Sequence, residues 1–580
     1  MASDGCAGSS PARGTFKSLF IMRKNLILFV SAVGMIAMTS CSSKLGALSA
    51  DNFNVVPNPM ETEAGKVPVT INGMFPEKYL KKKAVVSVIP ELRCSNGDVV
   101  QGQSATFQGE KVQGNDQTIS YKLGGNYTMK NIFTYIPAMQ KSDLYLTFDA
   151  KVGKKKVSVP AVKVAEGVIA TSELYRNLLT STGACIAPDT FQRINAHKQE
   201  AQIKFLVNQA NLRKSELKNN SITEFVEMLK RINRERETLA IKDIDVLGFA
   251  SPEGAYDFND KLANKRQNTA EQYVKDQLKK TKVNTDINAK YTAEDWDGFQ
   301  QLVQASNIQD KDVILRVLSM YKDPQEREQQ IRNMSAGYRE LADGILPELR
   351  RSRMIINYET IGRSDEQIQQ QYVADPAQLS VDELLYSATL TNDVNKQEEI
   401  YKKTAQLYPN DYRALNNIAA LEFNKGNNDA AKEYINKVFN VLSNAPEANA
   451  NLGMIALQNG DIANAENYIG KATNANGLNN VLGALNIAKG NYAEAARNLA
   501  NSESNLAGLA ELLNKNYATA EVILNSVKNK DGMTKYLQAL VAARQGRSSI
   551  ASGFLKEALN LDPSLAAYAN NDLELLNVSK

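Results

Sequence analysis

Apolar and polar residues alternate in short runs over residues 55–168, as they do in β-strands with one buried face. The clearest runs cover residues 67–71 and 84–89, and turn signals such as Gly124-Gly125-Asn126 separate the runs. Closely spaced strands of this kind predict an antiparallel β-sandwich. We expect this sandwich to be a spacer or docking module, because nothing in it resembles a catalytic site.

A helical period replaces this alternation after residue 200. Apolar side chains recur on one helix face from Ile222 to Ile232. Ser221 and Glu224, three residues apart, predict a capping box at the start of this helix. The helix is therefore expected to cover a sheet with its apolar face.

Apolar runs follow this helix and predict the strands of that sheet, at residues 244–249, 287–292 and 353–358. A block with helical spacing, about residues 294–347, precedes the last run, where it either walls a site or enlarges the core. Within it Glu294 and Asp295 form an acidic pair that we expect on the surface. Residues 200–363 are thus predicted to form an α/β domain, and residues 165–200 its junction with the sandwich.

Helical spacing with regularly placed small residues fills residues 381–575. Turn glycines recur 34 and 30 residues apart, at Gly426, Gly460 and Gly490. Gly453 and Gly483 are placed where paired helices approach closely. These spacings resemble tetratricopeptide repeats, which implies an all-α solenoid of five or six helical hairpins whose concave face holds protein partners. Residues 364–380, rich in Gln, Asp and Ser, are predicted to be a linker.

Composition excludes several classes of function. A chain of 580 residues is too long for one core, and a net charge of +4 with a single tryptophan gives no basic, aromatic surface for nucleic acid. The four cysteines form no Cys-x-x-Cys pair, and His197 is the single histidine, so the usual zinc cages and histidine-based hydrolases are not expected. We therefore predict no catalytic residues, no metal site, no cofactor and no enzymatic activity. His197 is expected in an exposed linker.

The N-terminus resembles the signal of a bacterial lipoprotein. Met22-Arg23-Lys24 precedes a short apolar run, and Met38-Thr39-Ser40-Cys41 looks like a lipobox. The resemblance implies a signal peptide at residues 22–40, preceded by an upstream extension at residues 1–21. Lipidation of Cys41 would anchor the protein to the outer membrane without spanning it.

After processing, residues 41–54 are predicted to be a polar tether. The residues directly after Cys41 are not acidic, which favours a protein that faces the periplasm. Display on the cell surface is the alternative. Cys94 and Cys185 lie in different predicted regions, so two free thiols are favoured over a disulfide.

The stretch from Gly248 to Arg266 reads as a strand end, a tight turn and a helix start. It resembles the corner of the OmpA-like (OmpA/MotB C-terminal) domain, whose family binds the peptide stem of peptidoglycan. The resemblance implies that Arg266 pairs with a stem-peptide carboxylate, with Asn259 beside it. Ser251 stands where the family has an aspartate, so Glu253 is the candidate replacement. The alternative is that Arg266 pairs locally and wall binding has been lost.

Together these features predict a multidomain chain with an N-terminal β-sandwich, a central α/β OmpA-like domain and a C-terminal all-α tetratricopeptide solenoid. The favoured function is a non-enzymatic outer-membrane lipoprotein that links membrane assemblies to peptidoglycan and to protein partners. The alternative is an assembly factor or surface antigen that acts through protein contacts alone.

Overall fold

The structure is a computed structural model that describes residues 45–308, 310–333, 335–576 and 578. The predicted upstream extension, the signal peptide and Cys41 lie outside the described residues. The chain groups into two compact units, and each is described separately below. One unit combines Met1–Pro188 with Tyr401–Lys580, and the other is Asp189–Ile400.

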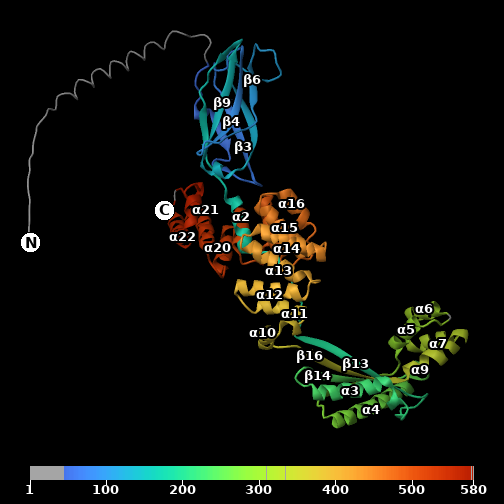
Figure 1. Cartoon of the computed structure of the whole chain (residues 1–580). Helices are drawn as coiled ribbons and strands as arrows, with labels where there is room; N and C mark the ends of the chain where they lie inside the picture. The colour runs from blue at the N-terminus through green and yellow to red at the C-terminus, as the bar shows by residue number, and fades with distance from the viewer. Residues whose placement is uncertain (1–44, 309, 334, 577, 579–580) are drawn as a thin grey trace, which may run out of the picture. The chain divides into compact units, whose positions relative to one another are not determined.

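Two sheets form the N-terminal part of the first unit (Figure 1). The first sheet has the antiparallel order β1 (Phe53–Val56), β3 (Lys66–Phe75) and β8 (Gly125–Thr134). The second has the order β10–β9–β4–β6–β7, with β11 also paired to β9 and β5 to β4. Its strands are β4 (Ala84–Cys94), β5 (Val99–Gln101), β6 (Ala105–Gly109), β7 (Gln117–Ile119), β9 (Ser142–Val152), β10 (Lys155–Val157) and β11 (Val162–Glu166). A short parallel pair, β2 (Met60–Glu61) with β12 (Val168–Ile169), completes this part.

Alternating side chains of both sheets fill one core. Val69 and Ile71 of β3 and Val86 and Val88 of β4 are all buried there, as the alternation in the sequence predicts. The prediction of a β-rich N-terminal region is confirmed. β8 was not predicted, because its first residues read as a turn, although every second residue from Tyr127 onward points into the core.

The predicted tether at residues 41–54 is wrong over its described part. Leu45 and Leu48 are buried in the core of the sandwich, and a short 3-10 helix, η1 (Ala50–Asn52), leads directly into β1. The reason is physical: leucines spaced along a polar stretch can bury their side chains against an open sheet edge, which the local composition does not reveal.

Helical hairpins form the C-terminal part of the same unit. They are α13 (Tyr412–Asn424) with α14 (Asn428–Val441), α15 (Pro446–Gln458) with α16 (Ile462–Ile469), α17 (Leu478–Ala488) with α18 (Tyr492–Asn498), α19 (Asn505–Leu513) with α20 (Tyr517–Ser526), and α21 (Gly532–Arg544) with α22 (Ser548–Leu561). The array ends with α23 (Ala566–Ala569) and η8 (Leu573–Leu575). It begins within α12 (Val394–Leu407), in which the two units meet along the chain.

Glycines allow the two helices of a hairpin to touch. A Cβ atom added to Gly483 would lie 2.4 Å from Cγ of Leu499, and one added to Gly453 would lie 2.5 Å from Cγ1 of Ile469. The prediction that small residues mark the close helix approaches is confirmed.

The chain between sandwich and array folds into the array. After η3 (Thr171–Leu174), helix α2 (Tyr175–Thr182) packs against α13, α15, α17 and α19, and Figure 1 shows it among them. Leu178 and Leu179 of α2 belong to the same apolar core as the array. This part of the predicted junction, residues 165–188, is therefore an integral part of the first unit.

The second unit is built on a sheet with the order β13–β16–β14–β15. The strands are β13 (Ile194–Lys204), β14 (Leu239–Phe249), β15 (Asp286–Thr292) and β16 (Arg351–Ile361), of which β14 and β15 run parallel. Helices α3 (Asn220–Arg234) and α4 (Tyr256–Thr281) cover one face and bury a shared core with the strands. The apolar residues predicted from Ile222 to Ile232 supply the α3 side of this core.

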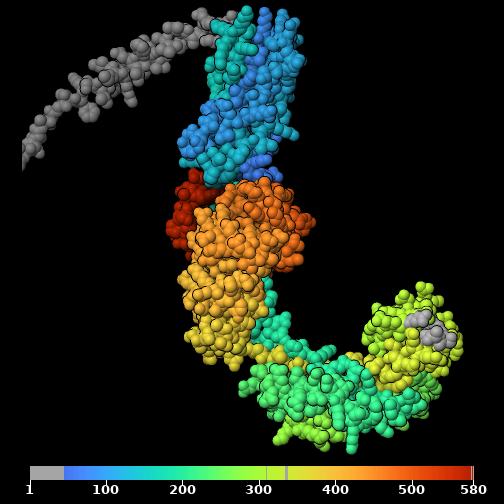
Figure 2. Space-filling model, turned by 45° about the vertical axis from the view of Figure 1, so that its right-hand side comes forward, coloured from blue at the N-terminus to red at the C-terminus, as the bar shows by residue number. Residues whose placement is uncertain are grey.

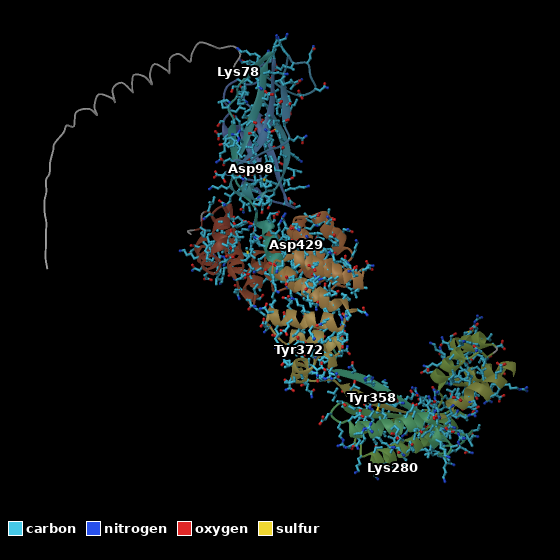
Figure 3. The ribbon with its side chains drawn as sticks, in the orientation of Figure 1. Lys78, Asp98, Lys280, Tyr358, Tyr372 and Asp429 are labelled. Atoms are coloured by element: carbon cyan, nitrogen blue, oxygen red, sulfur yellow. The ribbon has the colours of Figure 1, made fainter. Side chains whose placement is uncertain are left out.

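Two local predictions in this unit are wrong. The cap of α3 is Asn219, whose side chain accepts from the Ser221 backbone N–H, so Ser221 lies inside the first turn and forms no capping box. His197 lies in edge strand β13, not in a linker, and its ring stacks on that of Tyr358, with 5.3 Å between centroids. Figure 3 labels Tyr358. A polar sequence suits an edge strand whose open face meets water, which is why it resembles a linker.

The helical block before β16 has its own core. It comprises α5 (Trp296–Ala305), α6 (Lys311–Met320), α7 (Pro324–Asn333), α8 (Ser335–Glu340), a π-helical turn η5 (Leu341–Ile345) and α9 (Leu346–Leu349). Phe299, Ile314 and Leu349 are among its buried residues. In Figure 2 this yellow-green block forms a lobe at one end of the unit. It therefore folds around a core separate from that of the sheet, and α7 walls the corner described below.

The predicted linker at residues 364–380 is also wrong. It contains α10 (Asp365–Ala374), which is capped by Ser364 and Gln367 and buries Ile368, and it leads through η6 (Pro376–Gln378) to α11 (Val381–Thr389). The glutamine-rich composition of this segment suggested irregular structure. Glutamine is nevertheless a good helix former, and burial of Ile368 holds the helix against its neighbours.

Candidate functional site

The four residues predicted to bind peptidoglycan lie together at one corner of the second unit. Ser251 and Glu253 follow the end of β14, and Asn259 and Arg266 lie on α4. Ser251, Asn259 and Arg266 are buried, and Glu253 is partly exposed. The sequence thus brings the predicted residues together, but their polar groups have partners within the chain.

Arg266 is held by backbone oxygens. Its Nη1 donates to Phe249 O at 2.9 Å, its Nε to Gln209 O at 3.0 Å and its Nη2 to Leu206 O at 3.3 Å. The side chain is only 1% exposed. Burial and the neighbouring Arg350 lower its pKa to about 10, which leaves the guanidinium charged at neutral pH. Its geometry is that of a buried structural cation joining the β13 loop to the end of β14.

Glu253 is paired with an arginine of the chain. Its Oε1 accepts from Arg350 Nη2 at 2.9 Å and from Ser251 Oγ at 2.9 Å. Asn259 Nδ2 donates to the backbone O of Glu253 at 3.2 Å. Ser251 and Asn259 therefore fix the turn, and Glu253 already has a counter-charge.

The turn does bind a carboxylate, which comes from the helical block. The backbone N–H of Gly254 donates to Oε1 of Glu328 on α7 at 2.9 Å. A free N–H at a turn before a helix is a typical anion site. In this chain the anion is supplied internally.

The acidic pair beside this corner is only partly on the surface, contrary to expectation. Asp295 is buried, caps α5 by accepting from the Gly298 N–H at 2.8 Å, and pairs with Arg351 at 3.1 Å. Glu294 accepts from the indole N–H of Trp296 at 2.9 Å. Because both carboxylates have structural partners, the pair supports no acid–base role.

A second candidate site lies in the first unit, on the surface of the helical array that also receives α2 and is formed by α13, α15, α17 and α19; we call this surface the groove. Residues 183–188, here called the connector, leave α2 and run as an extended segment past α13 and α15. Asn451 accepts from the Cys185 N–H at 2.7 Å and donates to Cys185 O at 3.0 Å. Asn417 does the same to Ala187, at 2.8 and 3.1 Å. Each carboxamide thus binds the N–H and the O of one residue, in the way that a neighbouring β-strand would.

Further asparagines complete this set. Asn416 donates to Cys185 O at 3.0 Å, Asn476 donates to Ile186 O at 3.1 Å, and Asn424 accepts from the Ala184 N–H at 3.0 Å. Asn416, Asn417 and Asn451 are at most 1% exposed, and their amide groups take their partners from the connector and from one another. The groove holds a peptide backbone, and its occupant belongs to this chain.

Comparison with known proteins identifies the array. A tetratricopeptide repeat model matches residues 412–441 and 446–477. These hairpins are tetratricopeptide repeats. A search of curated proteins gives no match.

Parts of this chain are similar to several solved structures. A tetratricopeptide repeat protein from Parabacteroides merdae ATCC 43184 is 15% identical and aligns over 43% of this chain and 98% of its own, with a TM-score of 0.27. PilF of Pseudomonas aeruginosa is 12% identical and aligns over 36% of this chain and 98% of its own, with a TM-score of 0.26. The APC/C hetero-tetramer Cut9–Hcn1 is 18% identical over 36% of this chain, with a TM-score of 0.31, and the match spans 45% of that chain.

The two principal asparagines occupy equivalent positions of successive tetratricopeptide repeats. Asn417 and Asn451 are 34 residues apart, each five residues after the start of a matched repeat. Neither was predicted from the sequence. The available signal was a carboxamide recurring at the repeat period among apolar residues such as Ile418 and Leu452, which indicates a residue that needs a buried partner.

The two described thiols are free and buried. Burial raises the pKa of Cys185 to about 12, and burial also raises the pKa of Cys94. Both groups are therefore protonated at neutral pH and poor nucleophiles.

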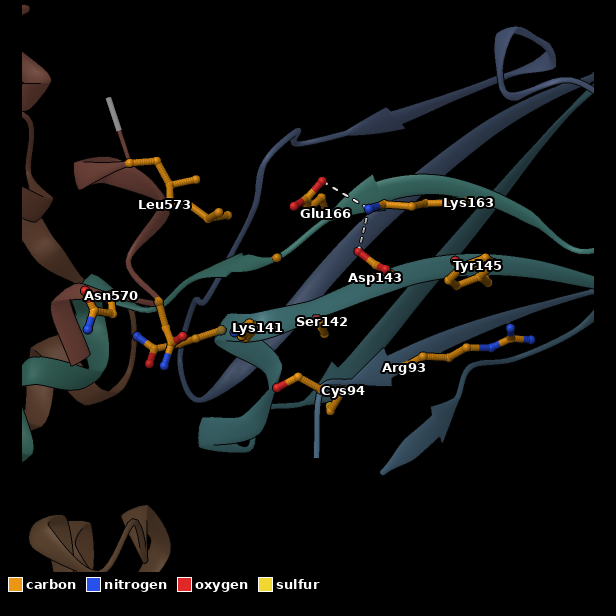
Figure 4. Close-up of a pocket in the computed structure, with 15 residues that line it drawn as sticks. Arg93, Cys94, Lys141, Ser142, Asp143, Tyr145, Lys163, Glu166, Asn570 and Leu573 are labelled. Carbon is orange, nitrogen blue, oxygen red and sulfur yellow. Dashed lines mark hydrogen bonds and ion pairs between the residues drawn. The ribbon is translucent and has the colours of Figure 1, made fainter. Parts of the chain in front are cut away.

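A cavity of about 560 Å³ lies between the sandwich and the end of the tetratricopeptide array, within the first unit (Figure 4). The charged residues that line it form ion pairs with one another, since Lys163 forms salt bridges with Asp143 at 2.7 Å and with Glu166 at 3.1 Å. Arg93 lies over the ring of Tyr145, 4.3 Å from its centroid. This pairing leaves no unpaired charge among these groups to select a ligand.

The described part of the chain contains no candidate metal site and no candidate membrane-spanning helix. No group of three His, Cys, Asp or Glu side chains there could hold a metal ion. Among the same residues, no helix combines the length and apolar character needed to cross a bilayer.

Proposed function

We propose that this protein is a non-enzymatic scaffold, anchored to the outer membrane through lipid on Cys41 and facing the periplasm, that binds protein partners through its tetratricopeptide repeats. One observation supports this proposal most directly. The groove of the repeats binds an extended polypeptide by its backbone, with paired carboxamide bonds from Asn417 and Asn451. A surface that holds one segment in this way is suited to protein recognition.

The remaining features favour the same class. Tetratricopeptide proteins are typically scaffolds, and their open solenoid faces rarely occur without a partner. The resemblance of residues 22–41 to a lipoprotein signal supports the membrane anchor.

Site-specific photo-crosslinking in cells tests the protein contacts. Val522 of α20 and Ile550 of α22 are exposed apolar residues of the repeats, 68% and 45% exposed, and serve as crosslinker positions. Lys275 of α4, an exposed residue outside the repeats, is the matched control. We expect discrete crosslinked proteins from the repeat positions and none shared with the control. If the repeat positions give the same diffuse background as the control, the proposal fails.

The membrane anchor has its own test. Cys41→Ala removes the lipidated side chain, so we expect the variant to lose incorporated palmitate and to shift from the membrane to the soluble fraction. Cys94→Ala is the control, since this thiol is buried in the sandwich. Membrane retention of the Cys41→Ala variant would contradict the anchor.

Peptidoglycan binding at the corner is a second candidate function. The observation that favours it is the bond between Gly254 N–H and the carboxylate of Glu328, because a stem-peptide carboxylate has the same chemistry. In this proposal a carboxylate of the wall peptide replaces that of Glu328. Ser251, Glu253 and Asn259 hold the turn in shape, and Arg266 holds the end of β14 through its bond to Phe249 O.

Retention on purified peptidoglycan tests this candidate. Glu328→Gln replaces the internal carboxylate with a neutral carboxamide, a weaker acceptor, and is expected to raise retention severalfold over wild type. Glu326→Gln on the same helix is expected to leave retention unchanged. If wild type and both variants are washed off alike, the corner does not bind the wall.

A further inference from the structure

We propose that the connector, residues 183–188, is an internal ligand that closes the tetratricopeptide groove, and that its release opens the groove to a partner segment of the same chemistry. This inference rests on the proposed scaffold function and specifies how that function is controlled. The partner segment is extended, carries small side chains at two alternate positions, and is bound by its backbone.

The spacing of the bonds defines the backbone requirement. Asn451 and Asn417 each bind both the N–H and the O of one residue, and these residues, Cys185 and Ala187, are two apart. A two-residue period is that of an extended strand, in which alternate residues face the same side. The N–H of Ile186, between them, donates no hydrogen bond among those found in the described part of the chain. The groove therefore distinguishes the N–H of Ile186 from the N–H groups of Cys185 and Ala187.

Burial defines the side-chain requirement. Cys185 and Ala187 are 3% and 1% exposed, whereas Ile186 is only partly buried. A Cβ atom added to Gly477 would lie 3.5 Å from the Cys185 sulfur, so the wall of this position is in van der Waals contact. Long or charged side chains fit neither alternate position without displacing the wall. Small residues are therefore selected at both, and the intermediate position is tolerant.

The connector is attached differently from the helix that precedes it. α2 is held by buried apolar side chains such as Leu178 and Leu179. The connector adds only small side chains such as Cys185 to this core and is also held by side-chain hydrogen bonds to its backbone. Gly183, at φ +89°, forms the corner between them. Rotation at this glycine can release the connector while α2 stays packed, because glycine tolerates both signs of φ.

Covalent attachment makes the connector a strong competitor. A tethered segment acts at an effective concentration in roughly the millimolar range, so a free segment with the same contacts competes poorly. The groove is thus closed at rest, and weakening the connector should increase binding of a free segment without any change to the groove itself.

The test uses the full chain and a fluorescent synthetic peptide with the sequence TGASIAPD, which matches residues 182–189 with serine in place of cysteine. Ala187→Lys in the protein places a charge at a buried connector position and should release the connector. Ile186→Lys is the matched control, because this position is partly exposed. We expect the Ala187→Lys variant to bind the probe about tenfold more tightly than wild type, and the control to match wild type.

Two further measurements show whether the groove is responsible. In the Ala187→Lys background, Asn417→Ala should abolish the gain in probe binding. A probe N-methylated at the residue matching Cys185 should fail to bind, and one methylated at the residue matching Ile186 should bind normally. Cys185→Lys provides an independent opening variant if Ala187→Lys does not fold, as judged by circular dichroism.

The proposal is overturned if both folded opening variants bind the probe no better than wild type, or if the two methylated probes behave alike. That result would leave the scaffold function intact, since crosslinks from α20 and α22 do not depend on the groove. Conversely, probe binding without cellular crosslinks would support the groove and contradict the scaffold.

Discussion

Replacing Arg266 should destabilise the second unit strongly, whatever the unit binds. The Arg266→Ala variant loses three hydrogen bonds from a charged donor to the backbone oxygens of Leu206, Gln209 and Phe249. Hydrogen bonds to charged groups contribute about 1.5–3 kcal/mol each, although losses within one cluster are not additive. The Phe249 oxygen left behind is buried, whereas those of Leu206 and Gln209 are only partly buried, so we expect a loss of about 4 kcal/mol in the free energy of unfolding.

Trp296 provides the assay. It is the single tryptophan of the chain and lies in the second unit, with its ring edge-on to Phe299 at 5.6 Å between centroids. Urea unfolding followed by tryptophan fluorescence in the full-length protein therefore reports on this unit alone. Arg266→Lys keeps a charge but fewer donors, so its midpoint should lie between those of wild type and Arg266→Ala.

Lys265→Ala is the matched control, because Lys265 is the neighbouring exposed residue of α4 and its replacement should change stability by less than about 0.5 kcal/mol. A folded Arg266→Ala variant that loses less than about 1 kcal/mol would refute the structural role. If Arg266→Ala loses about 4 kcal/mol of stability, its failure to bind peptidoglycan would not show that Arg266 contacts the ligand. The Glu328→Gln variant then becomes the informative test of peptidoglycan binding.

Three further predictions concern the first unit. Asn451→Ala removes the acceptor of the Cys185 N–H, so this amide hydrogen should exchange about thirtyfold faster, from a loss of about 2 kcal/mol, and Asn417→Ala should act likewise at Ala187. Burial raises the pKa of Asp572 to about 6, above its ordinary 3.8, so the native state favours the protonated form. The contribution of this group to the free energy of unfolding is therefore fully present below about pH 4 and is lost as the pH rises through about 6, a change of about 3 kcal/mol. Calorimetry at several pH values should detect this change in wild type and not in Asp572→Asn. Gly483→Ala should lower the melting temperature by overpacking against Leu499, whereas Gly553→Ala, with open space around it, should raise it.

The elements that the sequence predicted well are those whose burial pattern is local. The apolar face from Ile222 to Ile232 and the apolar strand at residues 244–249 each carry their period within one element. The errors occur where the partner is distant in sequence. Leu45 and Leu48 looked like parts of a tether because the sheet that buries them lies further along the chain. His197 looked like a linker residue because pairing with β16 is what makes its segment a strand.

The candidate sites show the same division between local and distant information. The corner could be predicted because Ser251, Glu253, Asn259 and Arg266 lie close together in sequence on a strand, turn and helix. What occupies the corner could not, because Glu328 reaches it from a separate helical block. In the repeats, the asparagines are visible at their 34-residue spacing, but the connector that they bind precedes them by more than 200 residues.

Both candidate sites are thus filled by groups of the same chain that match the chemistry of an external ligand. A carboxylate occupies the turn N–H at Gly254, and a peptide backbone occupies the asparagines of the repeats. Substitutions in the sites themselves remove structural partners as well as ligand contacts, as the Arg266 prediction illustrates. Substitutions in the occupants, Glu328 and Ala187, leave the sites intact. Binding that increases on changing an occupant can only arise from a site that was competent and closed, so these variants separate function from stability in both units.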